Sequence, residues 1–156
     1  MGIEIERKFL VASEGWRREP GRVTRFSQGY LSSDPARTVR VRIAGDEAFL
    51  TIKGATTGAT RAEFEYAIPV AEAQQLLALS DGPAVEKLRH LRVVDGLTWE
   101  VDEFLGANAG LVVAEIELAR EDKPFTRPDW LGAEVTGDAR YVNANLAVKP
   151  YAHWPR

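Results

Sequence analysis

Apolar and polar residues alternate along most of the chain, and this period of two is typical of strands that bury one face. Turn-forming residues divide the alternating stretches, and Asp95-Gly96 is a typical hairpin dipeptide between antiparallel neighbours. The pattern predicts an antiparallel sheet of eight strands. The predicted strands are Ile3–Val11, Arg22–Leu31, Thr38–Ala44, Ala48–Lys53, Ala62–Ile68, Val85–Val94, Leu97–Phe104 and Leu111–Leu118.

Two segments replace this alternation with a helical pattern. The first starts at Pro69, which suits a first helical position, and stops at Asp81-Gly82-Pro83. The second is predicted to start at Asp138, a typical N-cap residue, and to run to about Val148. Weaker signals indicate short helical turns around Ser13–Arg18 and Pro128–Leu131.

The polar face of the predicted strands is unusually charged, because ionisable residues, mostly in pairs of one sign, recur at a spacing of two. They are Glu4, Glu6 and Lys8, Arg40 and Arg42, Lys53, Glu63 and Glu65, Lys87 and Arg89, Glu100 and Asp102, and Glu115 and Glu117. Any single pair fits a solvated strand face, but like charges close together destabilise such a face. Their recurrence indicates that the charged faces converge on a shared interior.

These patterns predict one domain over residues 1–156 with an α+β fold, a closed eight-stranded antiparallel β-barrel flanked by a few helices. Its interior would be charged and wet, and its apolar outer face would be covered by the two helices and by loops. Buried charges are costly unless they are paired or hydrated. Carboxylates in such a tunnel would suit Mg²⁺ or Mn²⁺, and the Arg and Lys side chains would suit a polyanion.

Composition narrows the function classes. Twenty Lys and Arg against 23 Asp and Glu give a net charge of −3, so no overall positive charge favours nucleic acid. The absence of cysteine excludes disulfides, thiolate nucleophiles and cysteine-ligated zinc. A charged start of the chain and the lack of a long apolar run argue against a signal peptide and against membrane insertion. We therefore expect a cytoplasmic protein.

Short motifs follow one another along the chain in a recognisable order. They are EIERKFL at the start, then QGYL, RVRI, LTIK, RAEFEY, EKLRH, WEVDEF and AEIEL, and finally WLGAEVTGDARYVNANLA. This series resembles the CYTH domain, the family also called triphosphate tunnel metalloenzymes, over nearly the whole chain. The opening Glu-x-Glu-x-Lys motif is short, so the ordered series carries most of the resemblance.

The resemblance implies roles for individual side chains. The implied metal ligands are Glu4, Glu6 and Glu117, with Glu115 and Asp102 near a second metal. The implied triphosphate cradle is Lys8, Arg40, Arg42, Lys53, Lys87 and Arg89. Glu63 and Glu65 would orient the basic residues or a water molecule. Tyr30 would assist Lys8 in protonating or stabilising a phosphoryl oxygen, although a packing role for Tyr30 is equally compatible with the sequence.

The resemblance also implies hydrolysis of a small-molecule triphosphate, with inorganic tripolyphosphate split into pyrophosphate and phosphate as the first choice. Two alternatives stay open. The same barrel hosts class IV adenylate cyclases and enzymes that act on thiamine or nucleoside triphosphates. A non-catalytic sensor of polyphosphate or nucleotide is the other alternative, although a pure anion binder needs few carboxylates. Assembly as a homodimer is left open.

Overall fold

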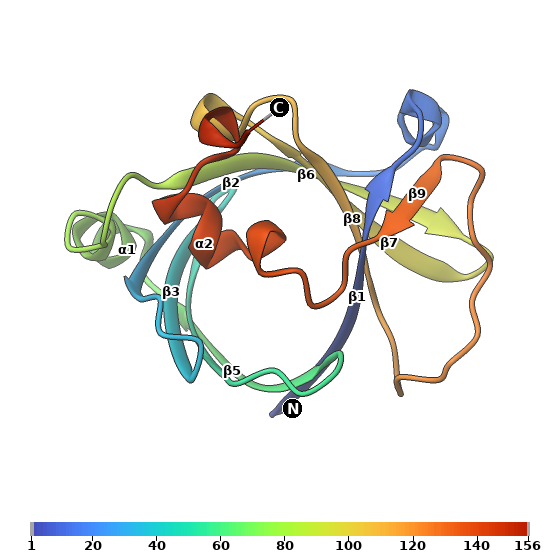
Figure 1. Cartoon of the computed structure of the whole chain (residues 1–156). Helices are drawn as coiled ribbons and strands as arrows, with labels where there is room; N and C mark the ends of the chain where they lie inside the picture. Colours follow the sequence, from blue (N-terminus) through green and yellow to red (C-terminus); the bar gives the residue numbers. More distant parts are fainter. Residues whose placement is uncertain (1, 156) are drawn as a thin grey trace.

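Eight antiparallel strands close into a barrel in the computed structural model, which describes residues 2–155 (Figure 1). The predicted fold class and all of the predicted strands are confirmed, with ends that differ by a few residues. The barrel strands are β1 Ile3–Val11, β2 Val23–Ser32, β3 Arg37–Ala44, β4 Glu47–Gly54, β5 Thr60–Ile68, β6 Val85–Val94, β7 Leu97–Phe104 and β8 Val112–Glu117. Their order is β5-β4-β3-β2-β6-β7-β8-β1, and pairing of β1 with β5 closes the ring.

A ninth strand, β9 (Leu131–Glu134), extends the sheet beside the end of β1. The turn expected at Pro128–Leu131 is present as one hydrogen-bonded turn, in which the Leu131 N–H donates to the carbonyl oxygen of Pro128 at 3.0 Å. It does not continue as a helix but leads directly into β9. The strand packs closely, since a Cβ atom added at Gly132 would lie 3.0 Å from the carbonyl oxygen of Leu10. Four residues without clear alternation were too short a signal to predict this strand.

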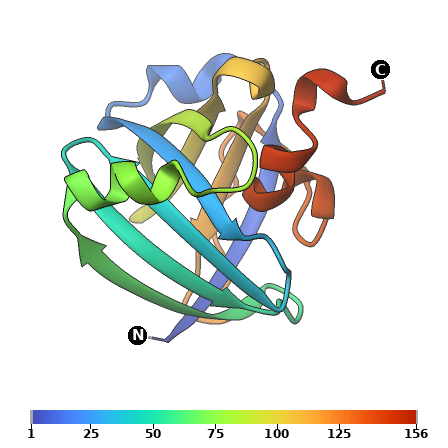
Figure 2. The same cartoon turned by 90° about the vertical axis from the view of Figure 1, so that its left-hand side faces the viewer.

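The apolar partners of the charged residues face outward and are covered on two sides of the barrel. On one side, Phe9, Trp99 and Ile116 pack under Trp16 of the short 3₁₀ helix η1 (Glu14–Arg18) and under Trp130. The turn expected at Ser13–Arg18 is therefore confirmed. On the other side, helix α1 (Val70–Leu77) lies across the outside of β3 and β4 (Figure 2). The barrel is thus inverted, apolar outside and charged inside.

Close packing explains why a glycine, Gly29, occupies the second position of the QGYL segment. A Cβ atom added at Gly29 would lie 2.7 Å from Ser80 Oγ and 3.0 Å from Leu77 Cδ2. The end of α1 therefore approaches strand β2 so closely that only a residue without a side chain fits at this position. This contact places Gln28 and Tyr30, on either side of the glycine, with their side chains on the inner face of the barrel.

The second predicted helix is broken. A 3₁₀ turn, η3 (Ala139–Tyr141), is capped by the Asp138 side chain, which accepts from the backbone N–H of Arg140. Val142 is then extended, with φ −72° and ψ 128°, and helix α2 follows as Asn143–Val148. The prediction of one continuous helix is therefore wrong, although the N-cap is confirmed.

Helix α2 also lies elsewhere than expected. It does not cover the outer face but crosses part of one mouth of the barrel (Figure 1). Its Leu146 and Ala147 pack there against Tyr30, Phe104 and Val113, which are buried at this end of the barrel. The other helices of the structure are η2 (Gly106–Asn108) and η4 (Tyr151–His153). Among residues 2–155, no helix has the length and apolar character needed to span a bilayer.

Candidate active site

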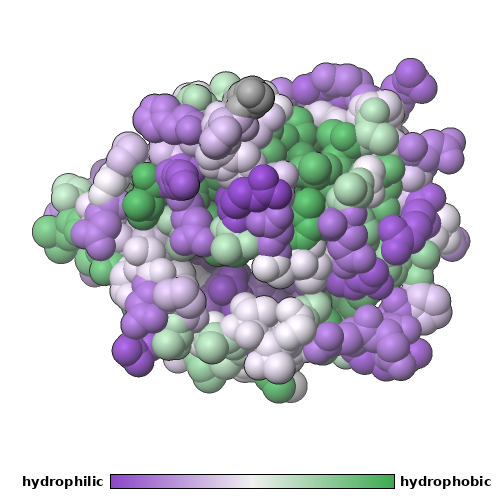
Figure 3. Space-filling view, in the orientation of Figure 1, coloured by the Kyte–Doolittle hydropathy of each residue, from purple (hydrophilic) through white to green (hydrophobic). Residues whose placement is uncertain are grey.

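The charged inner faces of the strands surround one cavity of about 230 Å³. Figure 3, in the orientation of Figure 1, shows a hollow near the middle of the molecule with hydrophilic residues in its depth. All but one of the site residues predicted from the sequence line this cavity. They are Glu4, Glu6, Lys8, Tyr30, Arg40, Arg42, Lys53, Glu63, Glu65, Lys87, Arg89, Glu115 and Glu117. The exception, Asp102, is fully buried behind Lys87 and Arg89.

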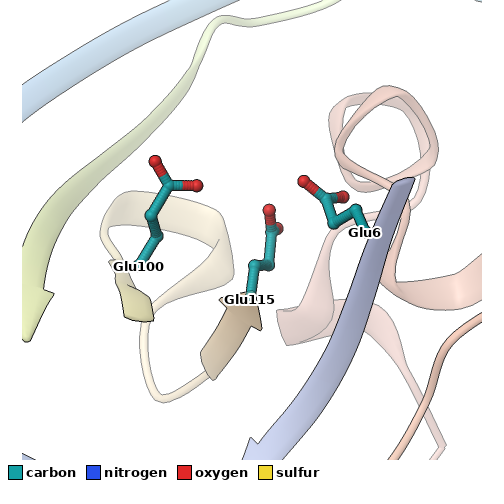
Figure 4. A group of neighbouring side chains, drawn as sticks. All are labelled: Glu6, Glu100 and Glu115. Carbon is teal, nitrogen blue, oxygen red and sulfur yellow. The ribbon is translucent and has the colours of Figure 1, made fainter. Parts of the chain in front are cut away.

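Three carboxylates from neighbouring strands form what we call the acidic wall: Glu6 on β1, Glu100 on β7 and Glu115 on β8. One oxygen of each lies within 4.8 Å of the others (Figure 4). Strand register explains the cluster, because Glu100 pairs directly with Glu115 across β7 and β8. Residues on one face of adjacent strands are then close enough for their side chains to meet.

The charges of the acidic wall are not balanced internally. Burial, together with the nearby Glu115 and Glu4 carboxylates, raises the pKa of Glu6 well above its usual value. Burial likewise raises the pKa of Glu100. Burial also disfavours the charge of Glu115, but Lys8 and Arg89 outweigh it and hold the pKa of Glu115 well below its usual value. A cation placed among these carboxylates would relieve their mutual repulsion.

The acidic wall fits a hard divalent cation, because its donors are carboxylate oxygens, the ligands that Mg²⁺ and Mn²⁺ prefer. Of the metal ligands predicted from the sequence, the structure brings Glu6 and Glu115 together. Glu100 belongs to the same group although the sequence did not single it out as a ligand. The available signal was its place in the Glu100-x-Asp102 pair.

The other predicted metal ligands have different surroundings. Glu4 is buried and accepts hydrogen bonds from Lys53 Nζ at 2.8 and 3.0 Å. Despite burial, Lys53 therefore lowers the pKa of Glu4. Asp102 accepts from Lys87 Nζ at 2.6 Å and from Arg89 at 2.8 Å. Glu117 pairs with Glu6 across β1 and β8, but it is exposed at the rim.

Four cations of the same cavity form what we call the basic wall: Arg40 and Arg42 on β3, and Lys87 and Arg89 on β6. Because β6 lies next to β7, Arg89 is also 3.3 Å from Glu100 and 3.9 Å from Glu115 of the acidic wall. Burial and the neighbouring Arg40 and Arg89 lower the pKa of Arg42 to about 9. Burial, opposed by Asp102 but reinforced by Arg89, lowers the pKa of Lys87 to about 7. Excess positive charge is thus concentrated here, and an anion would stabilise it.

One nitrogen atom of the Arg40 side chain lacks a hydrogen-bond partner among residues 2–155. One of its terminal nitrogens donates to Thr51 Oγ1 at 3.2 Å, and Glu65 lies 3.6 Å away. The buried Nε of Arg40 has no hydrogen-bond partner among residues 2–155. A buried donor without an acceptor is costly, so this atom is suited to meet a ligand oxygen.

Lys8, Tyr30 and Arg61 complete the lining. Lys8 Nζ lies 3.8 Å from Glu115 and donates to the carbonyl oxygen of Tyr141 at 3.4 Å. The buried Tyr30 hydroxyl accepts from Gln28 Nε2 at 2.9 Å. Arg61, which the sequence reading did not select, reaches within 3.7 Å of Glu4 from β5. The sequence could have indicated Arg61, because it is the first residue of RAEFEY and lies on the same strand face as Glu63 and Glu65.

Comparison with known proteins settles the family. The family model of the CYTH domain matches residues 2–151 of the chain. This chain belongs to the CYTH family. A curated relative of this CYTH protein from Acetivibrio thermocellus, named inorganic triphosphatase, is 50% identical over 155 residues and covers 99% of both chains. The resemblance seen in the ordered motifs is therefore confirmed.

Two further similarities agree with this placement of the CYTH chain. A relative from Nitrosomonas europaea, also named inorganic triphosphatase, is 37% identical over 150 residues, covering 93% of this chain and 97% of the relative. A solved structure of an inorganic triphosphatase is 37% identical, covers 93% of this chain and 94% of that chain, and superposes with a TM-score of 0.67. The CYTH barrel of this chain therefore shares both sequence and fold with proteins of that name.

Proposed function

We propose that this protein is a metal-dependent inorganic triphosphatase that splits tripolyphosphate into pyrophosphate and phosphate. The observation that carries the proposal is the presence of an acidic wall and a basic wall in one cavity. The name inorganic triphosphatase, given to relatives 50% and 37% identical over nearly the full length, supports the same reaction. We propose Mg²⁺ or Mn²⁺ as the ion.

In this proposal the chain itself binds and orients the substrate. Arg40, Arg42, Lys87 and Arg89 hold non-bridging phosphate oxygens, and the two-pronged arginine side chains fix their direction. Lys8 stays protonated because its pKa is raised: burial opposes the charge, but Glu115 and Glu6 favour it more strongly. When bound at the acidic wall, a divalent ion would stabilise the charge that develops on the phosphate oxygens. Positioning and charge are most of what phosphoryl transfer requires.

A second pocket next to the cavity offers no stacking surface for an organic group. It has a volume of about 580 Å³ and shares Glu4, Glu6, Lys8 and Arg61 with the cavity. Its remaining walls are small or uncharged residues for the most part, such as Ala36, Ala55, Ala59 and Ala139. None of the described residues that line it has an aromatic ring on which a nucleobase or a thiamine ring could stack.

The test is a substrate panel. Tripolyphosphate, ATP and thiamine triphosphate are each assayed with Mg²⁺ and with Mn²⁺, and phosphate, pyrophosphate and cyclic AMP are measured. We expect the highest kcat/KM for tripolyphosphate, no turnover without a divalent ion, and no cyclic AMP. Formation of cyclic AMP would instead identify a cyclase. Binding of tripolyphosphate without any product would identify a sensor.

A variant links the activity to the acidic wall. Glu6→Gln keeps the shape of the side chain but removes its charge, so turnover with Mg²⁺ should be abolished while the fold is retained. Glu47→Gln, at the exposed first residue of β4, removes the same charge away from the cavity and is the matched control. Wild-type activity in Glu6→Gln would contradict the proposal.

A further inference from the structure

Two uncharged amide side chains connect the basic wall to helix α2. Gln28 lies on β2 and is fully buried, and Asn143 is the first residue of α2 and lines the cavity. Gln28 Nε2 donates to Asn143 Oδ1 at 3.0 Å, which joins two residues that are 115 positions apart in the sequence. Neither residue belongs to the predicted metal or phosphate set.

The hydrogen bonds of this amide pair fix its orientation. Gln28 Oε1 accepts from Arg42 Nε at 2.8 Å, and a guanidinium group can only donate, so the Gln28 oxygen must face Arg42. Both hydrogens of Gln28 Nε2 are then used, one toward the Tyr30 hydroxyl at 2.9 Å and one toward Asn143. Asn143 Oδ1 accepts a second hydrogen bond, from Lys87 Nζ at 2.9 Å.

The partner of Arg42 differs in charge from the partners of the other cations. Lys53 is paired with Glu4, and Arg89 with Asp102. Arg42 makes no ion pair with any residue between 2 and 155, and it packs over the ring of Phe26 with 4.5 Å to the centroid. A neutral acceptor orients a guanidinium without cancelling its charge. The terminal nitrogens of Arg42 thus keep their full charge for an anion.

Lys87 is held in a related way. Its ammonium group has three N–H donors, of which one points to Asp102 Oδ2 at 2.6 Å and one to Asn143 Oδ1 at 2.9 Å. A third donor remains for a ligand. Had Asn143 been a carboxylate, Lys87 would carry two negative neighbours, and little net positive charge would remain at this point of the cavity.

We propose that Gln28 and Asn143 are positioning residues whose lack of charge is their essential property. They aim Arg42 and Lys87 at one phosphate group of the substrate without neutralising either cation, and they tie the start of α2 to that phosphate site. This inference rests on the proposed function, because it assigns the phosphate contact of the same cavity. It extends the binding site to two residues that touch the cations rather than the metal.

The test uses isosteric substitutions that add charge. Gln28→Glu would give Arg42 a carboxylate partner, and Asn143→Asp would give one to Lys87. Gln74→Glu, on the exposed part of α1, adds the same charge outside the cavity as a control. For each variant, KM and kcat for tripolyphosphate, binding of tripolyphosphate by calorimetry, and the thermal unfolding temperature are measured on the full chain.

We expect KM and the dissociation constant to rise about tenfold or more in Gln28→Glu and in Asn143→Asp, the factor that corresponds to one lost charged hydrogen bond. We expect kcat to stay within about threefold of the wild type. The unfolding temperature of Asn143→Asp should not fall, because the carboxylate keeps the oxygen that accepts from Gln28 and Lys87. Gln28→Glu loses the two hydrogen bonds that Gln28 Nε2 donates, so its unfolding temperature should be lower while kcat is kept. The control should match the wild type in every measurement. If Gln28→Glu does not fold, Asn143→Asp decides alone.

Two results would overturn the inference. One is an unchanged KM and affinity in both variants. The other is a parallel loss of unfolding temperature and kcat, which is the result expected if the amide pair only stabilises the fold. Measurements of tripolyphosphate binding and hydrolysis by the wild type distinguish a failure of this inference from a failure of the proposed function. A wild type that neither binds nor hydrolyses tripolyphosphate refutes both, whereas an active wild type with unaffected variants refutes only the roles of Gln28 and Asn143.

Discussion

The acidic and basic walls of the cavity use the same strand geometry but differ in how their charges are compensated. The acidic wall gathers Glu6, Glu100 and Glu115 within 4.8 Å of one another. Lys8 and Arg89 face Glu115, but the pKa of Glu6 and that of Glu100 remain raised. The acidic wall therefore has an excess of negative charge at its centre.

The basic wall has the opposite excess, and it is arranged differently. Asp102 lies behind Lys87 and Arg89 and compensates them from the side away from the cavity. Among residues 2–155, the Arg42 side chain has only the neutral Gln28 as a hydrogen-bond partner, and Arg40 Nε has none. The comparison shows that neither wall is neutral alone, so a cation and a polyanion bound together would satisfy both. The following changes test each wall separately, from the largest expected effect to the smallest.

Among these changes, removal of the charge of Glu115 should have the largest effect. Glu115 stays ionised and sits between Glu6 and Glu100, so Glu115→Gln should lower kcat with Mg²⁺ by about 10³-fold through loss of metal-assisted charge stabilisation. Steady-state phosphate release measures this, with thermal unfolding as a check of the fold. A decrease smaller than tenfold would remove Glu115 from the metal site.

Removing a charge from the basic wall should act on binding instead. Arg42→Gln should raise KM for tripolyphosphate by about 10- to 100-fold, the value of one or two charge-assisted hydrogen bonds, with a smaller change in kcat. Arg22→Gln, at an exposed position just before β2, is the matched control. A kcat loss at unchanged KM would place Arg42 at the reacting phosphate rather than in the cradle.

Substitution of Glu100 tests whether this residue, which the sequence did not single out, is a metal ligand. Because Glu100 is one donor among three, Glu100→Gln should weaken the apparent Mg²⁺ affinity by about tenfold, and excess Mg²⁺ should restore activity. A titration of activity against Mg²⁺ concentration measures both. If saturating Mg²⁺ fails to restore turnover, Glu100 acts on the substrate and not on the ion.

The smallest effect should be the pH dependence of the increase in unfolding temperature that Mg²⁺ causes. The raised pKa of Glu6 means that the folded state holds this proton more tightly than the unfolded chain does. Its contribution to stability is present at low pH and is lost as pH rises through the folded-state pKa. Because Mg²⁺ competes with the proton, its increase of the unfolding temperature should grow as pH rises above the ordinary carboxyl pKa of 4.5. Unfolding scans with and without Mg²⁺ measure this, and Glu6→Gln should flatten the trend.

Most of the cavity lining could be predicted from the sequence because side-chain direction in a strand is a local property. Alternation with a period of two is enough to place Glu4, Glu6 and Lys8 on one face, and the same holds for Arg40 and Arg42. The apolar outer face with Trp99 and Ile116 follows from the same pattern. These predictions needed no knowledge of which strands are neighbours.

The grouping of the charges could not be predicted in this way. Glu100 joins Glu115 only because β7 and β8 pair in that register, and a shift by one residue would turn Glu100 outward. Glu4 meets Lys53, and not a second carboxylate, because β5 closes the ring between β4 and β1. Such contacts depend on the pairing of strands far apart in the chain.

The broken helix shows the same limit. The residues after Asp138 have a helical pattern, yet Val142 is extended, and this places Asn143 against Gln28 and Lys87 inside the barrel mouth. Local propensity cannot anticipate a break whose benefit is a hydrogen bond to distant strands. Strand positions, the inward face and its charges therefore follow from short-range alternation. Which acid meets which base, and where α2 lies, follow from barrel closure, because register and packing between distant segments are set only when the whole ring forms.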